Sequence, residues 1–323
     1  MEGLAAPFAW LYQWWGTLAW LTLVVFCSGA LLEYYDREYA RRVFVAGWVV
    51  LATLWLASIY QFVFDQKSIT EGIGVIVGIP LSLYVGYLLA NGRDRLLVVS
   101  KAVGVMFAIY LPLSTVPFLR DPLIAVVTAQ TEMVLSLFTT DFIVVAGNNF
   151  PDYINLAEPN QSHTKSFVFR DPNIVYTIQL ACTGLGSIAI FGGLVAAVQA
   201  PFRRKLKALA AAVGIIYVLN IARNVFIAYT FGTQKLQVLP DLVVSVFALT
   251  HVEKVSYIVA DRIIAQFLSV VALVGITYVV VMQLPEVVAI VEEMLYVVTR
   301  KEYDLQRAMG VGARTDGGQS DQE

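Results

Sequence analysis

Long apolar runs dominate this chain, and short polar segments separate them. Seven runs reach about 20 residues, the length that a helix needs to cross a hydrocarbon core of roughly 30 Å. They lie near residues 11–32, 43–64, 70–90, 97–118, 182–200, 208–231 and 263–285. The pattern predicts an all-α polytopic membrane protein with about seven transmembrane helices.

Residues 119–181 carry a different pattern. Polar residues interrupt the apolar side of LIAVVTAQTEMVLSLF, which begins at Leu123, and this favours an amphipathic helix on the membrane surface. Short segments rich in β-branched and aromatic residues follow at 141–147, 166–170 and 174–179, with turn signals between them. We expect a small β-hairpin or three-stranded flap whose last strand leads directly into the fifth apolar run.

Two later segments complete the organisation. Residues 232–262 open with polar turn residues and continue as DLVVSVFALTHVEKVSYIVADR, which predicts an amphipathic helix at the membrane interface. An amphipathic stretch after Pro285 leads into ARTDGGQSDQE, whose composition is typical of disorder. The predicted parts are an N-terminal four-helix membrane segment (1–118), a surface helix and flap (119–181), a catalytic membrane core (182–285) and a tail (286–323).

Composition supports the membrane assignment. Of the 323 residues, 58% are hydrophobic and 14% are charged, which is too little polar surface to close into a soluble globule. The net charge of -2 provides no basic face for nucleic acid, and we expect no nucleic-acid partner. The first ten residues, MEGLAAPFAW, lack the positive n-region of a cleaved signal peptide, so the first run is expected to be a retained span.

The positive-inside bias predicts the orientation. Three loops, near residues 37–42, 93–95 and 203–207, contain nine basic residues, whereas the loops around Lys67 and Arg120 contain one each. Seven spans satisfy this distribution if the N-terminus is outside, the tail is cytoplasmic and the whole of 119–181 is extracytoplasmic.

The motif ACTGLGS, residues 181–187, places one of only two cysteines where a strand becomes a membrane helix. The positive end of that helix is expected to lower the thiol pKa of Cys182 and to favour the nucleophilic thiolate. Thr183 and Ser187 can cap the first turn, and the two glycines of the motif permit close approach of a backbone or substrate. The alternative is a buried cysteine acting as a small hydrophobe, and Cys27 keeps that interpretation. No disulfide is suggested.

Two arginines lie in or beside predicted membrane spans, where a charge is energetically unfavourable. Arg223, in NIARNVF, lies roughly 12 Å below the outer end of its predicted helix, where a charge normally faces a cavity or a partner. Asn220 and Asn224 flank it as amides. The alternative is an arginine that snorkels outward, or one paired with a carboxylate such as Asp261 to hold helices together. Arg262 begins the last predicted span at the same membrane level, where it is either an interfacial anchor or a charge that stabilises a thiolate and an oxyanion.

His251, in ALTHVEKVSY, is a candidate general base near these residues. The alternative is a histidine hydrogen-bonded at the interface. No second histidine or carboxylate lies four residues after it, which disfavours a zinc site. We expect neither a metal nor a cofactor.

The spacing of three motifs is similar to that of a known family. ACTGLGS begins one span, NIARNVF lies in the next and ADRIIAQF begins the last, with 41 residues from Cys182 to Arg223 and 39 from Arg223 to Arg262. The chain resembles the exosortase and archaeosortase family between residues 45 and 285. The resemblance implies a membrane cysteine transpeptidase in which Cys182 is the nucleophile and Arg223 and Arg262 are the other catalytic residues. Bacterial relatives more often carry histidine at the third position, which leaves the general base open between Arg262 and His251.

The resemblance also implies the substrates. Members act on secreted proteins with a C-terminal sorting signal, which consists of a short signature, a hydrophobic helix and a basic end. In the archaeal branch the signature is Pro-Gly-Phe, the clients include surface-layer glycoprotein, and removal of the helix is coupled to attachment of a membrane phospholipid. Two other functions remain open: a transporter, since intramembrane arginines also mark anion paths, and a lipid-modifying acyltransferase that does not cleave.

Overall fold

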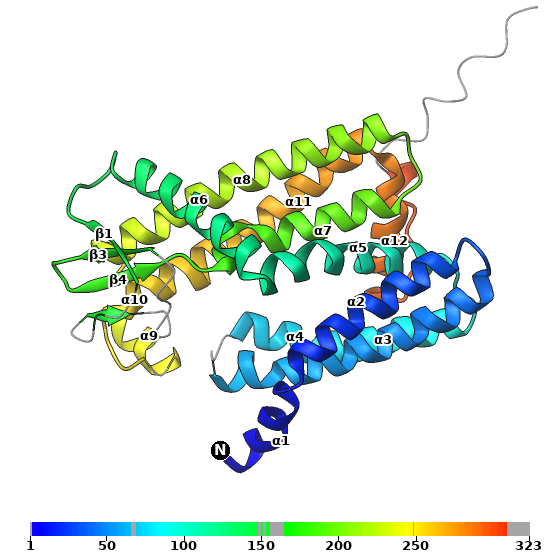
Figure 1. Cartoon of the computed structure of the whole chain (residues 1–323). Helices are drawn as coiled ribbons and strands as arrows, with labels where there is room; N and C mark the ends of the chain where they lie inside the picture. Colours follow the sequence, from blue (N-terminus) through cyan, green and yellow to red (C-terminus); the bar gives the residue numbers. More distant parts are fainter. Residues whose placement is uncertain are drawn as a thin grey trace, which may run out of the picture. The chain divides into compact units, whose positions relative to one another are not determined.

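The computed structural model of the chain describes residues 2–65, 69–147, 150, 153–155, 165–247 and 249–308. Figure 1 labels the helices and strands of the chain, whose segments divide into two compact units that alternate along the sequence. Unit 1 comprises Met1–Leu111, Ala189–Ala210 and Val279–Glu323, and unit 2 comprises Pro112–Ile188 and Ala211–Tyr278.

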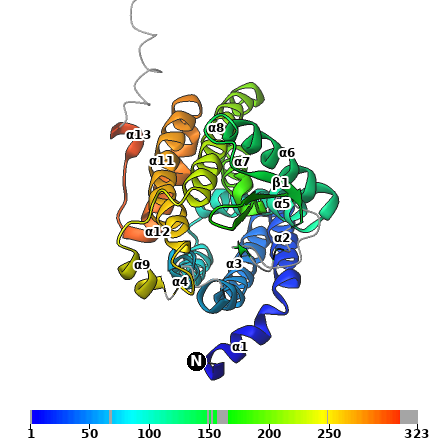
Figure 2. The ribbon, with the colours of Figure 1, turned by 90° about the vertical axis from the view of Figure 1, so that its left-hand side faces the viewer.

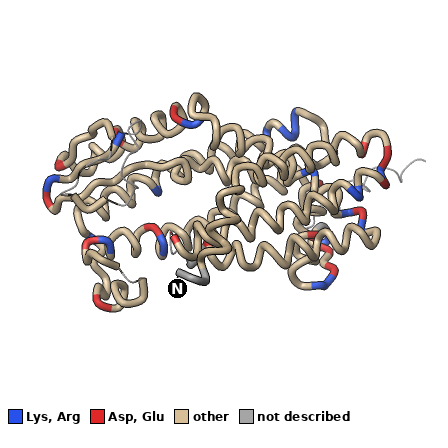
Figure 3. Tube along the Cα trace, turned by 60° about the horizontal axis from the view of Figure 1, so that its bottom comes forward, with Lys and Arg blue, Asp and Glu red and all other residues tan. Residues whose placement is uncertain are grey.

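Six helical segments within the described residues are long and apolar enough to cross a membrane. They are Trp15–Leu32, Arg37–Asp65, Glu71–Ala90, Leu96–Thr115, Phe202–Gly232 and Lys254–Gln283. Charged residues gather mainly at the ends of the long helices, as a membrane interior requires (Figure 3). The chain is a polytopic, mostly helical membrane protein, as the apolar runs predict.

The fifth predicted span is shorter than expected. The run at 182–200 forms α7 over Leu185–Ala197, and these 13 residues extend only about 20 Å at 1.5 Å per residue. Gly184, in a left-handed conformation with φ of 76°, separates α7 from the turn before it, and Pro201 precedes the next helix. The apolar composition continues beyond the helix at both ends, which is why the run looks longer than the helix that it forms.

Unit 1 contains the helices of the N-terminal half. They are α1 (Glu2–Tyr12), α2 (Trp15–Leu32), α3 (Arg37–Ile59) with the π-helical η1 (Tyr60–Asp65), α4 (Ile69–Ala90) and most of α5 (Leu96–Thr115). Figure 2 shows α3 between α2 and α4, and it contacts both. Phe26 packs against Phe44 and Trp48 in this core, and the Trp48 indole donates a hydrogen bond of 2.9 Å to Ser100.

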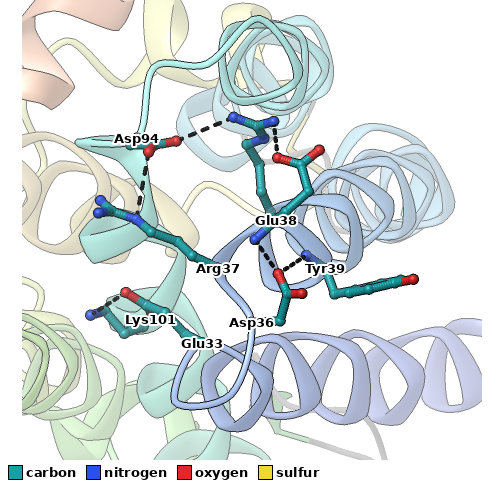
Figure 4. A network of polar contacts seen from close by, with 8 residues as sticks. Glu33, Asp36, Arg37, Glu38, Tyr39, Asp94 and Lys101 are labelled. Atoms are coloured by element: carbon teal, nitrogen blue, oxygen red, sulfur yellow. Dashed lines mark hydrogen bonds and ion pairs between the residues drawn. The ribbon is translucent and has the colours of Figure 1, made fainter.

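Polar contacts fix the helix ends of unit 1 (Figure 4). The Asp36 carboxylate caps α3 by accepting hydrogen bonds from the backbone amides of Glu38 and Tyr39, at 2.8 and 3.2 Å. Asp94 forms ion pairs of 3.5 and 3.6 Å with Arg37 and Arg41, which links the start of α3 to the turn between α4 and α5.

Ion pairs hold the C-terminal part of unit 1, and Glu293 is the buried member of one of them. It contains η4 (Pro285–Val287), α12 (Val288–Thr299) and α13 (Leu305–Ala308). Glu293, in α12, accepts a hydrogen bond of 2.7 Å from Arg93, and Glu286 accepts two bonds from Arg204. The predicted amphipathic stretch is therefore a helix. The predicted disordered end, ARTDGGQSDQE, lies outside the described residues.

Unit 2 contains the predicted surface helix and flap. Helix α6 spans Pro117–Leu135, and its buried residues, Ile124, Val127, Thr128, Thr131 and Leu135, lie on one face. Strands β1 (Ile143–Ala146), β3 (Lys165–Phe169) and β4 (Ile174–Thr177) pair antiparallel, which confirms the predicted flap. The prediction missed β2 (Ile154–Asn155), which pairs parallel with β4, so that the sheet order is β1-β3-β4-β2. Two residues are too few to show a strand period.

The remaining elements of unit 2 differ in detail from the prediction. Helix α8 spans Phe202–Gly232. The predicted interfacial helix is two short helices, α9 (Pro240–Phe247) and α10 (Lys254–Tyr257), with a bend at 249–251. A π-helix, η3 (Ile258–Ala265), continues from α10 into α11 (Gln266–Gln283). The last span thus begins near residue 254 rather than 263, and Arg262 lies inside it rather than at its start.

Candidate active site

Cys182 lies in the turn that joins the sheet to a helix of unit 2. Strand β4 is followed by the 3-10 turn η2, Leu180–Thr183, and then by Gly184 and α7. The Cys182 amide donates to the carbonyl of Gln179 at 2.9 Å. The Thr183 hydroxyl donates to the carbonyl of Leu180 and accepts from the amide of Leu185, so it caps the first turn of α7 as predicted.

Helix α8 fixes the backbone of this turn. The side-chain amides of Asn220 and Asn224 both donate to the Cys182 carbonyl, at 2.6 and 2.8 Å. Gly184 allows the close approach, because a Cβ there would lie 3.2 Å from the Ile216 side chain and 3.4 Å from Asn220. The second glycine of the motif, Gly186, has no such neighbour within 4 Å. The predicted accessory residues Asn220 and Asn224 thus contact the turn through its backbone.

Arg223 lies between these two asparagines in sequence and is bound to a buried carboxylate. Its Nη2 is 2.5 Å from Oδ1 of Asp261, a residue of η3 that is 7% exposed. The other carboxylate oxygen, Oδ2, is 3.7 Å from Nε of Arg262. One carboxylate therefore contacts both of the predicted arginines. The Tyr257 hydroxyl also bonds to Asp261.

The sulfur of Cys182 lies against the core of unit 2 and in an electrostatic field of both signs. Burial raises the pKa of the Cys182 thiol, the nearby Arg223 charge opposes this rise, and Asp261 adds to it. The sequence predicted a lowered pKa from the helix terminus, and that prediction is wrong because desolvation by the surrounding core outweighs the cation. Burial therefore favours the neutral thiol of Cys182, whereas the neighbouring guanidinium of Arg223 favours the thiolate.

Tyr176, on β4, is a neighbour of the Cys182 thiol that the sequence did not indicate. Its side chain is 3% exposed, and its hydroxyl lowers the pKa of the Cys182 thiol by hydrogen bonding. Burial, followed by the charge of Cys182, raises the pKa of Tyr176 well above its usual value, so the hydroxyl keeps its proton as a donor. An aromatic residue six positions before the cysteine, on the strand that leads into it, was the available signal.

Two buried polar atoms near the thiol, Nε of Arg223 and Oδ1 of Asn224, have no hydrogen-bond partner among the described residues. Buried polar atoms in folded proteins nearly always have partners, and each exception calls for an explanation such as a catalytic role or a bound group. Nε of Arg223 can donate a hydrogen bond, so the cluster can bind a carbonyl oxygen or an oxyanion.

Among the described residues, no side-chain hydrogen bond or ion pair joins His251, Ser187 or Cys27 to this cluster. His251 is exposed in the bend between α9 and α10, where its carbonyl accepts from the Lys254 amide. Ser187 is half-buried in the first turn of α7. Both cysteines are free, and Cys27 lies in α2 of unit 1.

A hollow of about 720 Å³ opens elsewhere in unit 2. One wall is a face of α6, formed by Ala129, Glu132, Met133 and Ser136, and the other is the start of β1 with the residues before it. None of its lining residues is one of the predicted site residues.

Comparison with known proteins gives consistent matches. A family model described as transmembrane exosortase (Exosortase_EpsH) matches residues 14–253, a range that includes Cys182 and Arg223 and ends before Arg262. Archaeosortase A of Haloferax volcanii is 42% identical over 307 residues, which cover 91% of this chain and 97% of the relative. Archaeosortase A of Natronomonas pharaonis is 38% identical over 284 residues, covering 87% and 88%. No solved structure matches the chain significantly.

Proposed function

This chain belongs to the transmembrane exosortase family, and we propose that this membrane processing enzyme is a cysteine transpeptidase with Cys182 as its nucleophile. Its substrates are secreted proteins with a C-terminal sorting signal made of a short Pro-Gly-Phe signature, a hydrophobic helix and a basic end. The similarity to two archaeosortases over most of the chain supports this substrate class.

The first step forms a thioester. The Cys182 sulfur bonds to the carbonyl carbon of the scissile peptide, the carbon–nitrogen bond breaks, and the thiol proton passes to the leaving amine. Arg223 and Arg262 stabilise the negative charge that develops on the carbonyl oxygen. Arg262 cannot be the base, because a guanidinium does not lose its proton in proteins. His251 remains the predicted proton acceptor.

The second step releases the product. An amine-bearing phospholipid attacks the thioester carbonyl, its nitrogen bonds to the acyl carbon, and the sulfur leaves and recovers a proton. The client becomes lipid-anchored in place of its hydrophobic helix. Attack by water instead gives a free carboxylate, and exclusion of water by the small sheet that precedes Cys182 favours transfer.

The observation that carries the proposal is the environment of one sulfur. Cys182 has its carbonyl held by Asn220 and Asn224, and the residue between them is a half-buried arginine whose charge favours the thiolate. A cysteine that only fills space in a core does not need a fixed carbonyl and a neighbouring cation. A nucleophile requires a fixed backbone and a nearby cation.

Substitution of the nucleophile tests the proposal. With Cys182→Ser, we expect complete loss of cleavage of a client, read by mass spectrometry of its C-terminus, with normal membrane insertion. Cys27→Ser is the matched control and should process the client normally. Undiminished removal of the terminal helix by Cys182→Ser would refute the assignment. A client that carries lipid but keeps its helix would indicate an acyltransferase instead.

A further inference from the structure

Asp261 contacts both arginines of the candidate active site. Its Oδ1 is 2.5 Å from Nη2 of Arg223, and its Oδ2 is 3.7 Å from Nε of Arg262. The residue is 7% exposed, and a buried carboxylate is stable only with such partners. The two arginines belong to different elements, α8 and η3, and the Asp261 carboxylate is an ion-pair partner of both.

The π-helix makes the arrangement possible. Asp261 and Arg262 are adjacent in sequence, and Tyr257 precedes them by four and five positions. A π-helix has more residues per turn than an α-helix, so both positions lie close to the residue one turn earlier, and such turns are frequent at functional sites. Tyr257 bonds to Asp261 and interacts with the charge of Arg262.

The ion pair with Asp261 also determines which nitrogen of the Arg223 guanidinium can donate to another group. Asp261 binds Nη2, whereas Nε is buried and has no hydrogen-bond partner among the described residues. A guanidinium is a rigid planar fork, so fixing one nitrogen orients the others. The remaining N–H is a preformed donor.

We propose that Asp261 is a positioning residue that orients Arg223 and Arg262 for the reaction at Cys182. This inference rests on the proposed function. Asp261 does not touch the substrate. It holds the two cations through one carboxylate and leaves Nε of Arg223 directed to the developing oxyanion.

The competing explanation is that Asp261 only ties α8 to η3. The effect of its negative charge on the Cys182 thiol distinguishes the two explanations. Five groups act on the Cys182 sulfur: the backbone of Gln179, Tyr176 from β4, Arg223 from α8, Asp261 from η3 and Tyr257 from α10. Asp261 raises the pKa of the Cys182 thiol, and Arg223 lowers it. Removing only the negative charge should therefore lower the thiol pKa while the arginines lose their fixed orientation.

The test is Asp261→Asn in a Cys27→Ser background, so that Cys182 is the only thiol. We expect kcat for a client peptide to fall by about a hundredfold, the order of loss that a misplaced catalytic group causes, with KM changed less than about threefold because uniform binding is retained. Alkylation of Cys182 by iodoacetamide at pH 7 should become faster. Asp241→Asn, at an exposed carboxylate of α9, is the control and should change neither rate.

Asp261→Glu covers the case in which the asparagine variant does not fold. It keeps the charge and displaces it, so thiol alkylation should match the parent while kcat still falls. Unchanged kcat in a folded Asp261→Asn protein, or loss of kcat without faster alkylation, would overturn the inference. If kcat persists in Cys182→Ser, the proposed function fails instead, and the alkylation rates still report whether Asp261 acts on the sulfur.

Discussion

At the scale of single residues, the surroundings of the Cys182 sulfur decide its reactivity, because burial raises the pKa of the thiol and the Arg223 charge opposes this rise. One stretch of α8 contacts the turn that contains Cys182. This stretch carries Asn220, Arg223 and Asn224, and the two asparagines donate to the Cys182 carbonyl. The sequence predicted the wrong direction for the pKa shift of the Cys182 thiol. A helix terminus can be recognised in a sequence, whereas desolvation by a folded core cannot.

The raised thiol pKa predicts an alkaline profile. Because the folded protein favours the neutral thiol, the reactive thiolate is scarce at neutral pH and becomes populated as pH rises toward the raised pKa. Alkylation of Cys182 and kcat/KM should both increase from pH 7 to 9, values that bracket the usual thiol pKa of about 8.5. Iodoacetamide kinetics in the Cys27→Ser background measure the first quantity. A rate that is already at its plateau at pH 7 would contradict the raised pKa.

Arg223 should shift this profile in a way that depends on charge and shape. Arg223→Gln removes the charge that lowers the thiol pKa, so the alkylation profile moves to higher pH. Arg223→Lys keeps the charge and loses the planar fork, so alkylation is largely retained while processing is severely impaired. Lys235→Gln, at an exposed cation of the same unit, is the control.

At the scale of elements, strong periodic signals were reliable and short ones were not. The surface helix and the three antiparallel strands are where the pattern predicts them. The two-residue strand β2 and the break between α9 and α10 carry no period that a sequence can show. The last span includes the π-helix η3, whose Asp261 and Arg262 interrupt the apolar pattern, so the pattern placed the start of the span after them.

The two glycines of ACTGLGS should differ sharply. Gly184→Ala forces a side chain into a left-handed conformation against α8, which should lower the free energy of unfolding by roughly 1–2 kcal/mol and slow processing. Gly186→Ala enters open space within α7 and should be neutral or stabilising by about 0.5–1 kcal/mol. Thermal unfolding in detergent compares the variants. Equal effects at both positions would show that the turn does not need its left-handed residue.

At the scale of the whole molecule, composition was sufficient to predict a multi-pass membrane protein, and the distribution of basic residues predicts its orientation. We propose that the candidate active site faces the extracytoplasmic side. In a background that lacks both native cysteines, an impermeant maleimide should label Val238→Cys on intact cells and Lys207→Cys only after lysis. Both parent side chains are exposed. The reverse labelling would contradict the predicted orientation.

The central claim is that Cys182 forms a covalent acyl intermediate. The most direct measurement incubates the Cys27→Ser protein with a peptide that carries the sorting signature and identifies the adduct by mass spectrometry after rapid acid quenching. We predict a thioester on Cys182 that hydroxylamine releases, with the same peptide losing its C-terminal helix. Cleavage of the peptide with no adduct on residue 182 at any quench time, and with equal efficiency in Cys182→Ser, would contradict the account.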